Sequence, residues 1–314
     1  MRSRFSGQTL THPKWSTLAF VAIGIVSSVW SATSFAASCC GGGFLSQSII
    51  TGDERATLAS GFSFSNISTE VSDQGLWQNR SVPETLETFR VQGAHIFSDR
   101  FQIGGSIPFV RRTRGGGNSS GLGDATLTLG YEILPEWDYS YWRPRGVSYV
   151  TITAPSGRSI QDATDSLQLD VRGRGFWAIG IGTTLTKIIS KFDFLTTFEL
   201  HRSFPREIST ETFAGQLVPG FGAAWSVGSG LNFNDSRVGA SLGFNYEDAV
   251  ETRGRLASTG APVRFATASL TASQMFAGDW TASLMISDQT LFGAPTNTTL
   301  AKSATVTLQR RFQR

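Results

Sequence analysis

His201 and Ser203 are two residues whose spacing suggests nucleophilic catalysis. They lie two positions apart, so both side chains point to the same face of an extended strand. A histidine so placed can act as the base that activates a serine hydroxyl. Asp193 and Glu199 share this face, and their acidic side chains predict that it points into a wet interior. In such an interior, the simpler interpretation is that His201 only forms a hydrogen bond. We therefore assign no catalytic residue and expect that the protein is not an enzyme, with hydrolysis as the alternative.

Other residue types that carry chemistry are few. His95 and His201 are the histidines that follow the N-terminal segment, and no cysteine or carboxylate stands at metal-ligand spacing from either. We predict no metal site and no cofactor. Cys39 and Cys40 are adjacent and precede three glycines. A strained disulfide between them, pairing with another chain, soft-metal binding and acylation of Cys39 all remain open, and we assign them no role.

The charge of the chain excludes several classes of protein. Of 314 residues only 16% are charged, and Arg2, Arg4 and Lys14 account for the whole net charge of +3. Without these three residues the acidic and basic side chains balance, which argues against nucleic acid as a partner because binding needs a basic excess. Low charge with 34 glycines and 23 phenylalanines also argues against disorder.

The N-terminal segment has the features of an export signal. The three basic residues precede an apolar run over 18–29, and Ser34-Phe35-Ala36 fits the small-x-small cleavage pattern of a signal peptide. The run is shorter than the ~20 apolar residues that span a bilayer. We predict a signal peptide over 1–36 that is cleaved after Ala36, with a lipoprotein acylated on Cys39 as the alternative, and a Cys/Gly leader over 37–54.

The remaining sequence alternates apolar and polar residues in segments of strand length. In one such segment Leu127, Leu129 and Tyr131 alternate with Thr128 and Gly130, the period-2 pattern of a strand with two different faces. The pattern predicts twelve strands, over 55–66, 86–97, 100–112, 121–134, 146–154, 175–188, 191–203, 214–227, 236–246, 262–276, 279–288 and 301–312.

Long and short connections alternate between these strands. Long, polar links at 67–85, 155–174 and 247–261 contrast with tight ones at 98–99 and 189–190. A transmembrane β-barrel has this rhythm, an even strand number, and strands that close on themselves because open edges cannot be satisfied in hydrocarbon. A secreted β-sandwich also alternates but does not require the rhythm. We predict an all-β fold, with a single antiparallel transmembrane barrel over 55–314 and both termini on the periplasmic side.

The two faces of the strands predict what meets lipid and what lines the lumen. The apolar face carries Leu127, Leu129, Leu284 and Ile286, which we expect to contact lipid near the middle of the membrane, whereas Thr128 and Ser283 point inward. Charged and amide side chains on the inward face are our candidates for residues that line the lumen and determine its function. They are Arg90, Gln92, Asp124, Glu132, Asp193 and Glu199.

Arginines gather near the strand ends that precede or follow the long loops. Guanidinium groups suit phosphate oxygens, so lipopolysaccharide contact is one interpretation, attraction of anionic solutes a second, and balanced loop charge a third. The candidates are Arg111, Arg112, Arg114, Arg172 and Arg174.

Two further features resemble known outer-membrane proteins. Phe312 ends the last alternating strand and is similar to the C-terminal aromatic that the barrel-assembly machinery reads, although Gln313 and Arg314 follow it here. Gly121-Leu122-Gly123-Asp124, opening a strand that ends Leu129-Gly130-Tyr131, resembles a segment of the outer-membrane channels grouped with the MetA pathway of phenol degradation. That resemblance implies a barrel that passes small, often apolar, molecules and supplies no established functional residues. Asp124 would lie at the mouth, as a ligand contact or as a carboxylate that caps a turn.

The His201 and Ser203 pair also resembles the catalytic pair of twelve-stranded outer-membrane phospholipases. In those enzymes the pair faces lipid, whereas here it shares a face with acidic residues. The function that we expect is therefore an outer-membrane channel or uptake protein of a Gram-negative bacterium, surrounded by outer-membrane lipid and lipopolysaccharide. A phospholipase-type hydrolase and a plugged structural barrel are the alternatives.

Overall fold

The fold is described by a computed structural model, which covers residues 48–313 apart from 137–138, 210–213 and 255–256. The predicted signal peptide, its cleavage site, Cys39 and Cys40 lie outside the described residues. Within the described part of the chain, no helix is both long enough and apolar enough to cross a membrane.

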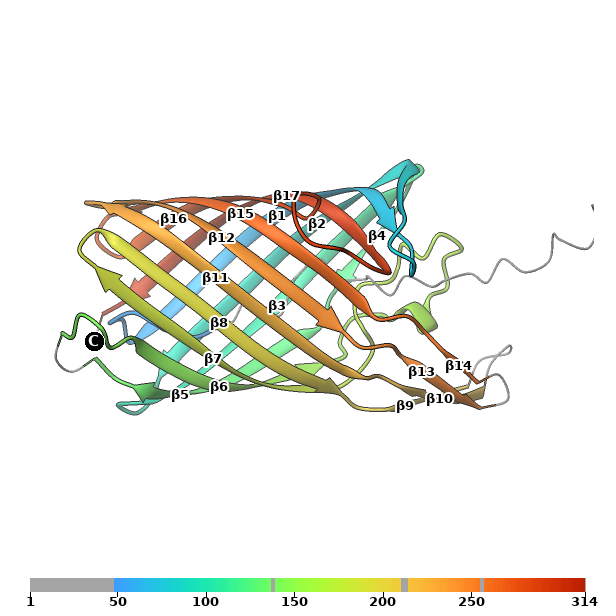
Figure 1. Cartoon of the computed structure of the whole chain (residues 1–314), viewed down its shortest axis with the longest axis horizontal. Helices are drawn as coiled ribbons and strands as arrows, with labels where there is room; N and C mark the ends of the chain where they lie inside the picture. Colours follow the sequence, from blue (N-terminus) through green and yellow to red (C-terminus); the bar gives the residue numbers. More distant parts are fainter. Residues whose placement is uncertain (1–47, 137–138, 210–213, 255–256, 314) are drawn as a thin grey trace, which may run out of the picture. The chain divides into compact units, whose positions relative to one another are not determined.

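Twelve antiparallel strands close into one barrel (Figure 1). Each strand pairs with its neighbour along the ring, and the ring closes because β1 pairs with β17 as well as with β2. The prediction of a twelve-stranded all-β barrel is confirmed. The strands are β1 (Ala56–Val71), β2 (Trp77–Ile96), β3 (Phe101–Arg114), β5 (Ala125–Leu134), β6 (Arg145–Ala154), β7 (Ala178–Ile189), β8 (Phe192–Ser203), β11 (Phe221–Phe233), β12 (Ser236–Glu247), β15 (Val263–Phe276), β16 (Trp280–Asp288) and β17 (Thr298–Phe312).

The period-2 pattern sorts side chains between the outside and the inside of this barrel. In β5, Leu127 and Leu129 are 45% and 47% exposed on the outer face, while Thr128 between them is 1% exposed on the inner face. Leu284 and Ile286 of β16 are likewise exposed on the outside. An apolar outer surface on a closed ring of strands is what contact with hydrocarbon requires.

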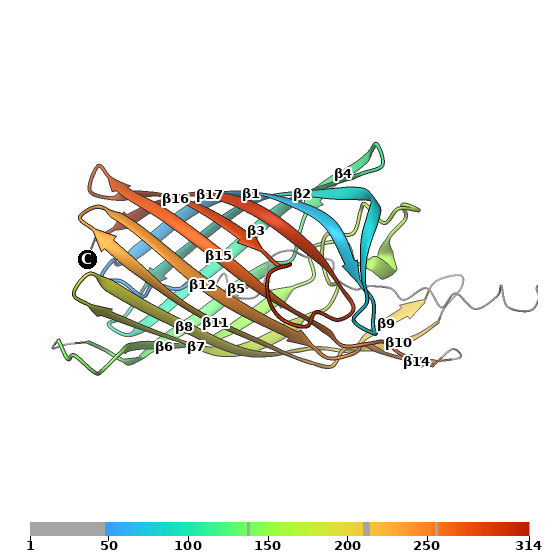
Figure 2. The same ribbon diagram turned by 45° about the horizontal axis from the view of Figure 1, so that its top comes forward.

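One end of the barrel has mostly short turns, apart from a longer connection between β5 and β6, and the other end has mostly long connections (Figures 1 and 2). The short-turn end contains the start of β1 and the end of β17, where the Arg55 N–H donates to the Phe312 carbonyl at 2.7 Å. Its turns pass through left-handed residues, among them Ser190, Asn234 and Gly278, which reverse the chain within a few residues.

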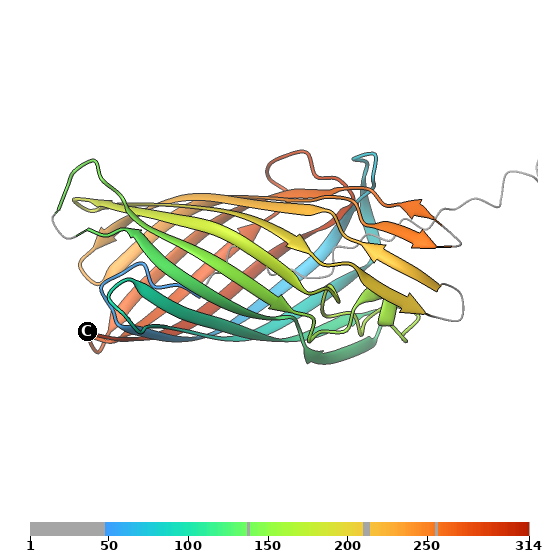
Figure 3. The same ribbon diagram turned by 90° about the horizontal axis from the view of Figure 1, so that it is seen from below.

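At the long-loop end the chain extends beyond the barrel. β4 (Gly117–Leu122) continues β3 as a hairpin. A second sheet of four short strands projects from the same end (Figure 3), consisting of β9 (Arg206–Ser209), β10 (Ala214–Val218), β13 (Glu251–Gly254) and β14 (Ser258–Thr259). The connection from β6 to β7 contains the short 3-10 helix η1 (Ile160–Asp162).

Some predicted boundaries differ from the observed ones. The segment 67–85, predicted as a loop, lies mostly in β1 and β2, and the strand predicted over 214–227 is β11 over 221–233. The glycine-rich end of β11 looked like a link, yet Gly230 faces inward under Arg237. A side-chain Cβ at Gly230 would come within 2.6 Å of the Arg237 guanidinium, so close packing across the strands explains this glycine.

Candidate functional site in the barrel lumen

One side of the lumen is an open cavity of about 440 Å³. Its wall is formed by β1, β2, β8, β11, β12 and β15–β17, and it combines hydroxyl side chains with apolar ones such as Leu195, Phe265 and Met285. Alternating positions of these strands point inward, so each strand contributes hydroxyls two residues apart. The hydroxyl-bearing lining residues are Ser63, Thr88, Ser226, Ser241, Thr267, Ser269, Ser287, Ser303, Thr305 and Thr307.

The charge of this cavity lining is restricted to a single cation. Arg90 is the charged lining residue, and amides such as Gln92 and Asn245 complete the polar surface. The hydroxyls bond to one another across the β1–β17 pair, where Thr305 Oγ1 donates to Ser63 Oγ at 2.9 Å. A hydroxyl both donates and accepts, so this wall can replace the hydration of a polar solute.

The opposite side of the barrel interior is packed. Thr184 and Thr197 share a hydrogen bond at 3.0 Å, and Ser106 and Thr126 share another at 2.9 Å. Tyr149 of β6 is 2% exposed, and its ring packs over Gly182 of β7. The interior is therefore asymmetric, with a hollow half and a packed half.

Inward-facing carboxylates near the short-turn end are paired with arginines. Arg145 Nε donates to Glu132 at 2.6 Å, and its Nη1 reaches Asp53 at 2.9 Å. Asp193 of β8 accepts two bonds from Arg237 of β12, at 2.6 and 2.7 Å. Two parallel bonds of this kind fix both side chains.

The segment before β1 also lies against the inner wall at this end. The Ile50 N–H donates to Gln102 Oε1 at 2.6 Å, and Gln102 Nε2 donates back to the Ile50 carbonyl at 3.1 Å. Ser48 Oγ donates to the Gly105 carbonyl at 3.0 Å, and Ile50 packs on Ala94. Residues 48–50 therefore reduce the bore between β2 and β3.

At the other end, the connection over 155–177, which we term the mouth loop, folds against the G-x-G-D segment. Asp124 accepts hydrogen bonds from the backbone N–H groups of Gly157, at 3.0 Å, and Arg174, at 2.7 Å. Ser156 Oγ donates to the Gly123 carbonyl at 2.7 Å. A Cβ at Gly121 would come within 2.7 Å of the Arg172 guanidinium. Asp124 thus holds together the two ends of the mouth loop.

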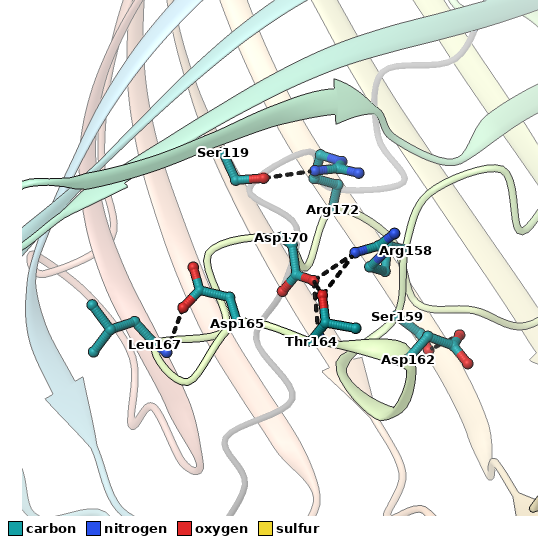
Figure 4. A network of polar contacts seen from close by, with 9 residues as sticks. All are labelled: Ser119, Arg158, Ser159, Asp162, Thr164, Asp165, Leu167, Asp170 and Arg172. Carbon is teal, nitrogen blue, oxygen red and sulfur yellow. Dashed lines mark hydrogen bonds and ion pairs between the residues drawn. The ribbon is translucent and has the colours of Figure 1, made fainter. Parts of the chain in front are cut away.

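Within the mouth loop, Asp170 organises the chain (Figure 4). Its carboxylate accepts from Arg158 Nη1 at 2.8 Å, from the Thr164 N–H at 2.9 Å and from the Thr164 hydroxyl at 3.0 Å. Burial opposes ionisation, but these donors outweigh it and lower the pKa of Asp170 to about 2. Arg172 extends to Ser119 of β4, with its Nη1 at 3.0 Å from the hydroxyl (Figure 4).

The mouth loop contacts both sides of the barrel opening. On one side, Arg112 of β3 donates to the Val171 carbonyl at 3.0 Å. On the other, Arg174 Nη2 lies 2.8 Å from Glu247 of β12. Arg206 of β9 forms two bonds with Asp162, at 2.6 and 2.7 Å. Bonds to both edges place the mouth loop across the opening.

Two other carboxylates at the mouth, Asp162 and Asp124, also have shifted pKa values. The bonds from Arg206 lower the pKa of Asp162. Burial raises the pKa of Asp124 despite the two backbone bonds that favour its ionised form.

The predicted lumen residues fall into separate environments. Arg90 and Gln92 line the cavity. Glu132 and Asp193 belong to the ion pairs near the short-turn end, and Glu199, 0% exposed, lies on the packed side. The hydroxyl lining was not among the predicted site residues. Its signal is the run Ser303, Thr305 and Thr307 on the inward positions of the last strand.

The predicted rim arginines do not form one patch. Arg112 points inward and pairs with Glu84 at 2.6 Å, whereas Arg111 points outward, 3.5 Å from Glu87. Arg172 and Arg174 hold the mouth loop. Arg114 ends β3 at the start of the hairpin with β4.

His201 and Ser203 both point into the barrel interior and are 3% and 6% exposed. His201 Nε2 lies 2.8 Å from Glu247 Oε1, the same oxygen that pairs with Arg174. This arrangement differs from a lipid-facing catalytic pair. Among the described residues, no group of three or more His, Cys, Asp or Glu side chains could hold a metal ion.

Comparison with solved structures reveals a relative of this barrel. The crystal structure of the COG4313 outer membrane channel from Pseudomonas putida F1 superposes with a TM-score of 0.70 at 14% sequence identity, over 85% of this chain and 98% of that chain. The chain has the fold of that outer-membrane channel. The barrel fold expected from the G-x-G-D resemblance is thereby confirmed.

Other barrels superpose less well. The translocator domain of the autotransporter NalP from Neisseria meningitidis gives a TM-score of 0.45 at 12% identity, over 83% of this chain and 89% of that one. A mutant of the monoaromatic hydrocarbon channel TodX gives 0.43 at 10% identity, over 84% and 91%. No protein-family model and no curated protein sequence matches the chain.

Proposed function

We propose that this chain is an outer-membrane channel that admits small molecules through the hollow half of its lumen. The observation that carries the proposal is the cavity of about 440 Å³ behind a closed wall whose outer face is apolar. A structural barrel gains stability by filling its interior. Here the side formed by β1, β2, β8, β11, β12 and β15–β17 is left open instead.

The short-turn end faces the periplasm in this proposal, and the long-loop end faces outward, as is usual for outer-membrane barrels. A solute entering from outside meets the mouth loop first, then the hydroxyl-lined cavity, and finally the segment 48–50. The mouth loop buries Leu169, Val171 and Phe176, and its attachment to the rim also uses hydrogen bonds and ion pairs. These polar contacts exchange with water at small net cost, which suits a loop that admits solutes.

The channel proposal is tested by two measurements on the full chain. Purified protein should migrate differently on gels before and after heating, because transmembrane barrels resist unfolding by detergent. Reconstituted into planar bilayers, it should give discrete conductance steps. A protein that partitions with the soluble fraction would contradict the membrane assignment.

A plugged structural barrel is distinguished by a second variant. Asp124→Asn weakens the hold on the mouth loop, so it should increase conductance if that loop restricts a path. Asp165→Asn is the matched control, because Asp165 accepts from the Leu167 N–H within the mouth loop and not from the barrel. If the wild type and both variants fold yet none of them conducts, the barrel is structural.

A further inference from the structure

An arginine lies on the apolar outer face of the barrel, near the short-turn end. Arg310 of β17 shares this face with Val306 and Leu308, and all three side chains are exposed. Its direct neighbours across the sheet are Leu58 of β1 and Trp280 of β16, the strands on either side of β17 (Figure 2). The positive charge is therefore surrounded by apolar side chains on the surface that meets the membrane.

Two aromatic rings hold the Arg310 guanidinium. Its Cζ lies 5.6 Å from the centroid of the Trp280 ring and 5.0 Å from that of the Phe312 ring. A ring face attracts a cation, but it does not accept the strong hydrogen bonds that the five N–H donors of a guanidinium can form. Among the residues that the structure describes, no carboxylate forms an ion pair with Arg310. The rings thus position a cation that can still bind an anion.

The place of Arg310 along β17 puts it at the edge of the apolar band. Lys302 lies on the outer face of the same strand near the long-loop end, 3.4 Å from Asp288. The eight residues from 302 to 310 span ~26 Å along a strand, or ~20 Å across a membrane at a tilt of ~40°. The apolar band of such barrels is ~25 Å tall, so both long side chains extend their charges to its two edges. Arg310 therefore lies where hydrocarbon meets lipid headgroups.

We infer that Arg310 is the centre of a binding site for the phosphate of an anionic phospholipid in the periplasmic leaflet. The inference rests on the proposed orientation of the barrel, with the short-turn end at the periplasm. The low dielectric at the membrane strengthens the attraction between guanidinium and phosphate, and the guanidinium fork matches two phosphate oxygens. Leu58 and Leu308 provide apolar surface for the acyl chains. A headgroup that contains its own ammonium binds less tightly, because that cation competes for the phosphate.

Native mass spectrometry of the full chain in neutral detergent measures this preference. Phosphatidylglycerol has an anionic headgroup, whereas phosphatidylcholine has a quaternary ammonium beside the same phosphate, and each is titrated with matched acyl chains. The first phosphatidylglycerol should bind about tenfold more tightly than the first phosphatidylcholine, as one additional charge-assisted hydrogen bond would produce. Arg310 lies two residues before Phe312, which resembles the assembly signal. The protein for this titration is therefore refolded from urea, so that its yield does not depend on the assembly machinery.

Substitutions then assign the preference to Arg310. Arg310→Gln should reduce the affinity ratio between the two lipids to about one, whereas Arg310→Lys, which retains the charge, should keep phosphatidylglycerol preferred. Trp280→Leu removes one ring that positions the guanidinium and should lower the ratio about threefold. Arg111→Gln is the matched control and should leave the ratio unchanged, because Arg111 also points outward but lies at the long-loop end, 3.5 Å from Glu87. Heat-modifiability on gels shows that each variant is folded.

Protein extracted from outer membranes in mild detergent distinguishes the two leaflets, because lipopolysaccharide occupies the outer leaflet and phospholipids the inner one. Arg310→Gln should lose co-purified anionic phospholipid and keep its lipopolysaccharide. Loss of lipopolysaccharide instead would show that the short-turn end faces outward, and the inference would fall together with the proposed orientation.

The outcomes separate the lipid site from the channel proposal. Equal affinity of the wild type for both lipids, or an unchanged ratio in folded Arg310→Gln, overturns the lipid site while the channel stands. A wild type that binds phosphatidylglycerol as expected but gives no conductance contradicts the channel and supports the lipid site.

Discussion

Asp124→Asn should release the mouth loop from the barrel. In the wild type, the two carboxylate oxygens of Asp124 accept from the N–H groups of Gly157 and Arg174, which lie near opposite ends of that loop. Asparagine retains one acceptor oxygen and places an NH₂ group where the second oxygen was. A donor then faces the N–H of either Gly157 or Arg174, and one bond is lost.

The expected cost follows from two opposing effects. A hydrogen bond to a charged acceptor contributes about 1.5–3 kcal/mol. Burial raises the pKa of Asp124, so part of its charge is unfavourably desolvated, and the neutral amide removes that penalty. The net loss is therefore about 1–2 kcal/mol. Since each 1.4 kcal/mol is a factor of ten, the open fraction of the mouth loop should rise about 5- to 30-fold.

Trypsin measures this opening directly, because the mouth loop contains Arg158, Arg172 and Arg174. When opening is fast compared with cleavage, the cleavage rate follows the open population. Asp124→Asn should therefore be cut about 5- to 30-fold faster than the wild type. Asp165→Asn makes the same change of residue type, but its amide oxygen can still accept from the Leu167 N–H within the loop, so its cleavage rate should stay near that of the wild type.

An unchanged cleavage rate in folded Asp124→Asn would refute the reasoning, because it would mean that other contacts hold the loop. Equal acceleration in both variants would show that the loop responds to the loss of any carboxylate charge, and that Asp124 has no special position.

Three other perturbations have defined outcomes. Leu129→Arg, on the lipid-facing side, should cost about 2–4 kcal/mol in folding into vesicles, and Ser283→Arg, on the half-exposed lumen side, should cost clearly less; equal penalties would contradict the face assignment. Glu132→Gln removes the charge that pairs with the largely buried Arg145, although an amide oxygen and Asp53 can still accept from it, and should lower the free energy of unfolding by about 1–3 kcal/mol without changing conductance, as measured in urea and in bilayers. Because the pKa of Asp170 is lowered to about 2 from 3.8, its contribution is complete above about pH 4 and is lost as the pH falls towards 2; hydrogen exchange in the mouth loop should show protection that declines over this range, and Asp170→Asn should remove the decline.

The faces of the strands were predictable, because successive side chains of a strand point to opposite sides of the sheet and the two sides of a membrane barrel have opposite polarity. Leu127 and Leu129 lie outside and Thr128 inside, as the pattern predicts. The pattern could not tell a packed inner wall from an open one. Thr128 is 1% exposed and lies against Thr151, so arginine at Thr128 should also be costly although it points inward, and Ser283 is the better control.

Pairing between charges depends on register, which a single strand does not reveal. Asp193 meets Arg237 because β11 lies between their strands and has Gly230 opposite Asp193. Glu132 meets Arg145 because Arg145 begins the neighbouring strand β6. From the sequence, the acidic residues were candidates for lining the path, whereas the small hydroxyl residues carried no such signal individually. Only closure of the ring brings those hydroxyls around one space.

The G-x-G-D segment connects the fold to the proposed function. Its pattern left open whether Asp124 caps a turn or contacts a ligand. The bonds from Gly157 and Arg174 favour the capping role, although the N–H groups that Asp124 caps belong to the mouth loop and not to its own turn. Gly121 is small because Arg172 of that loop packs over it. The segment therefore specifies how the mouth loop is attached to the barrel. Because the contacts of that loop lie at the rim, weakening the one at Asp124 should loosen the loop without unfolding the barrel.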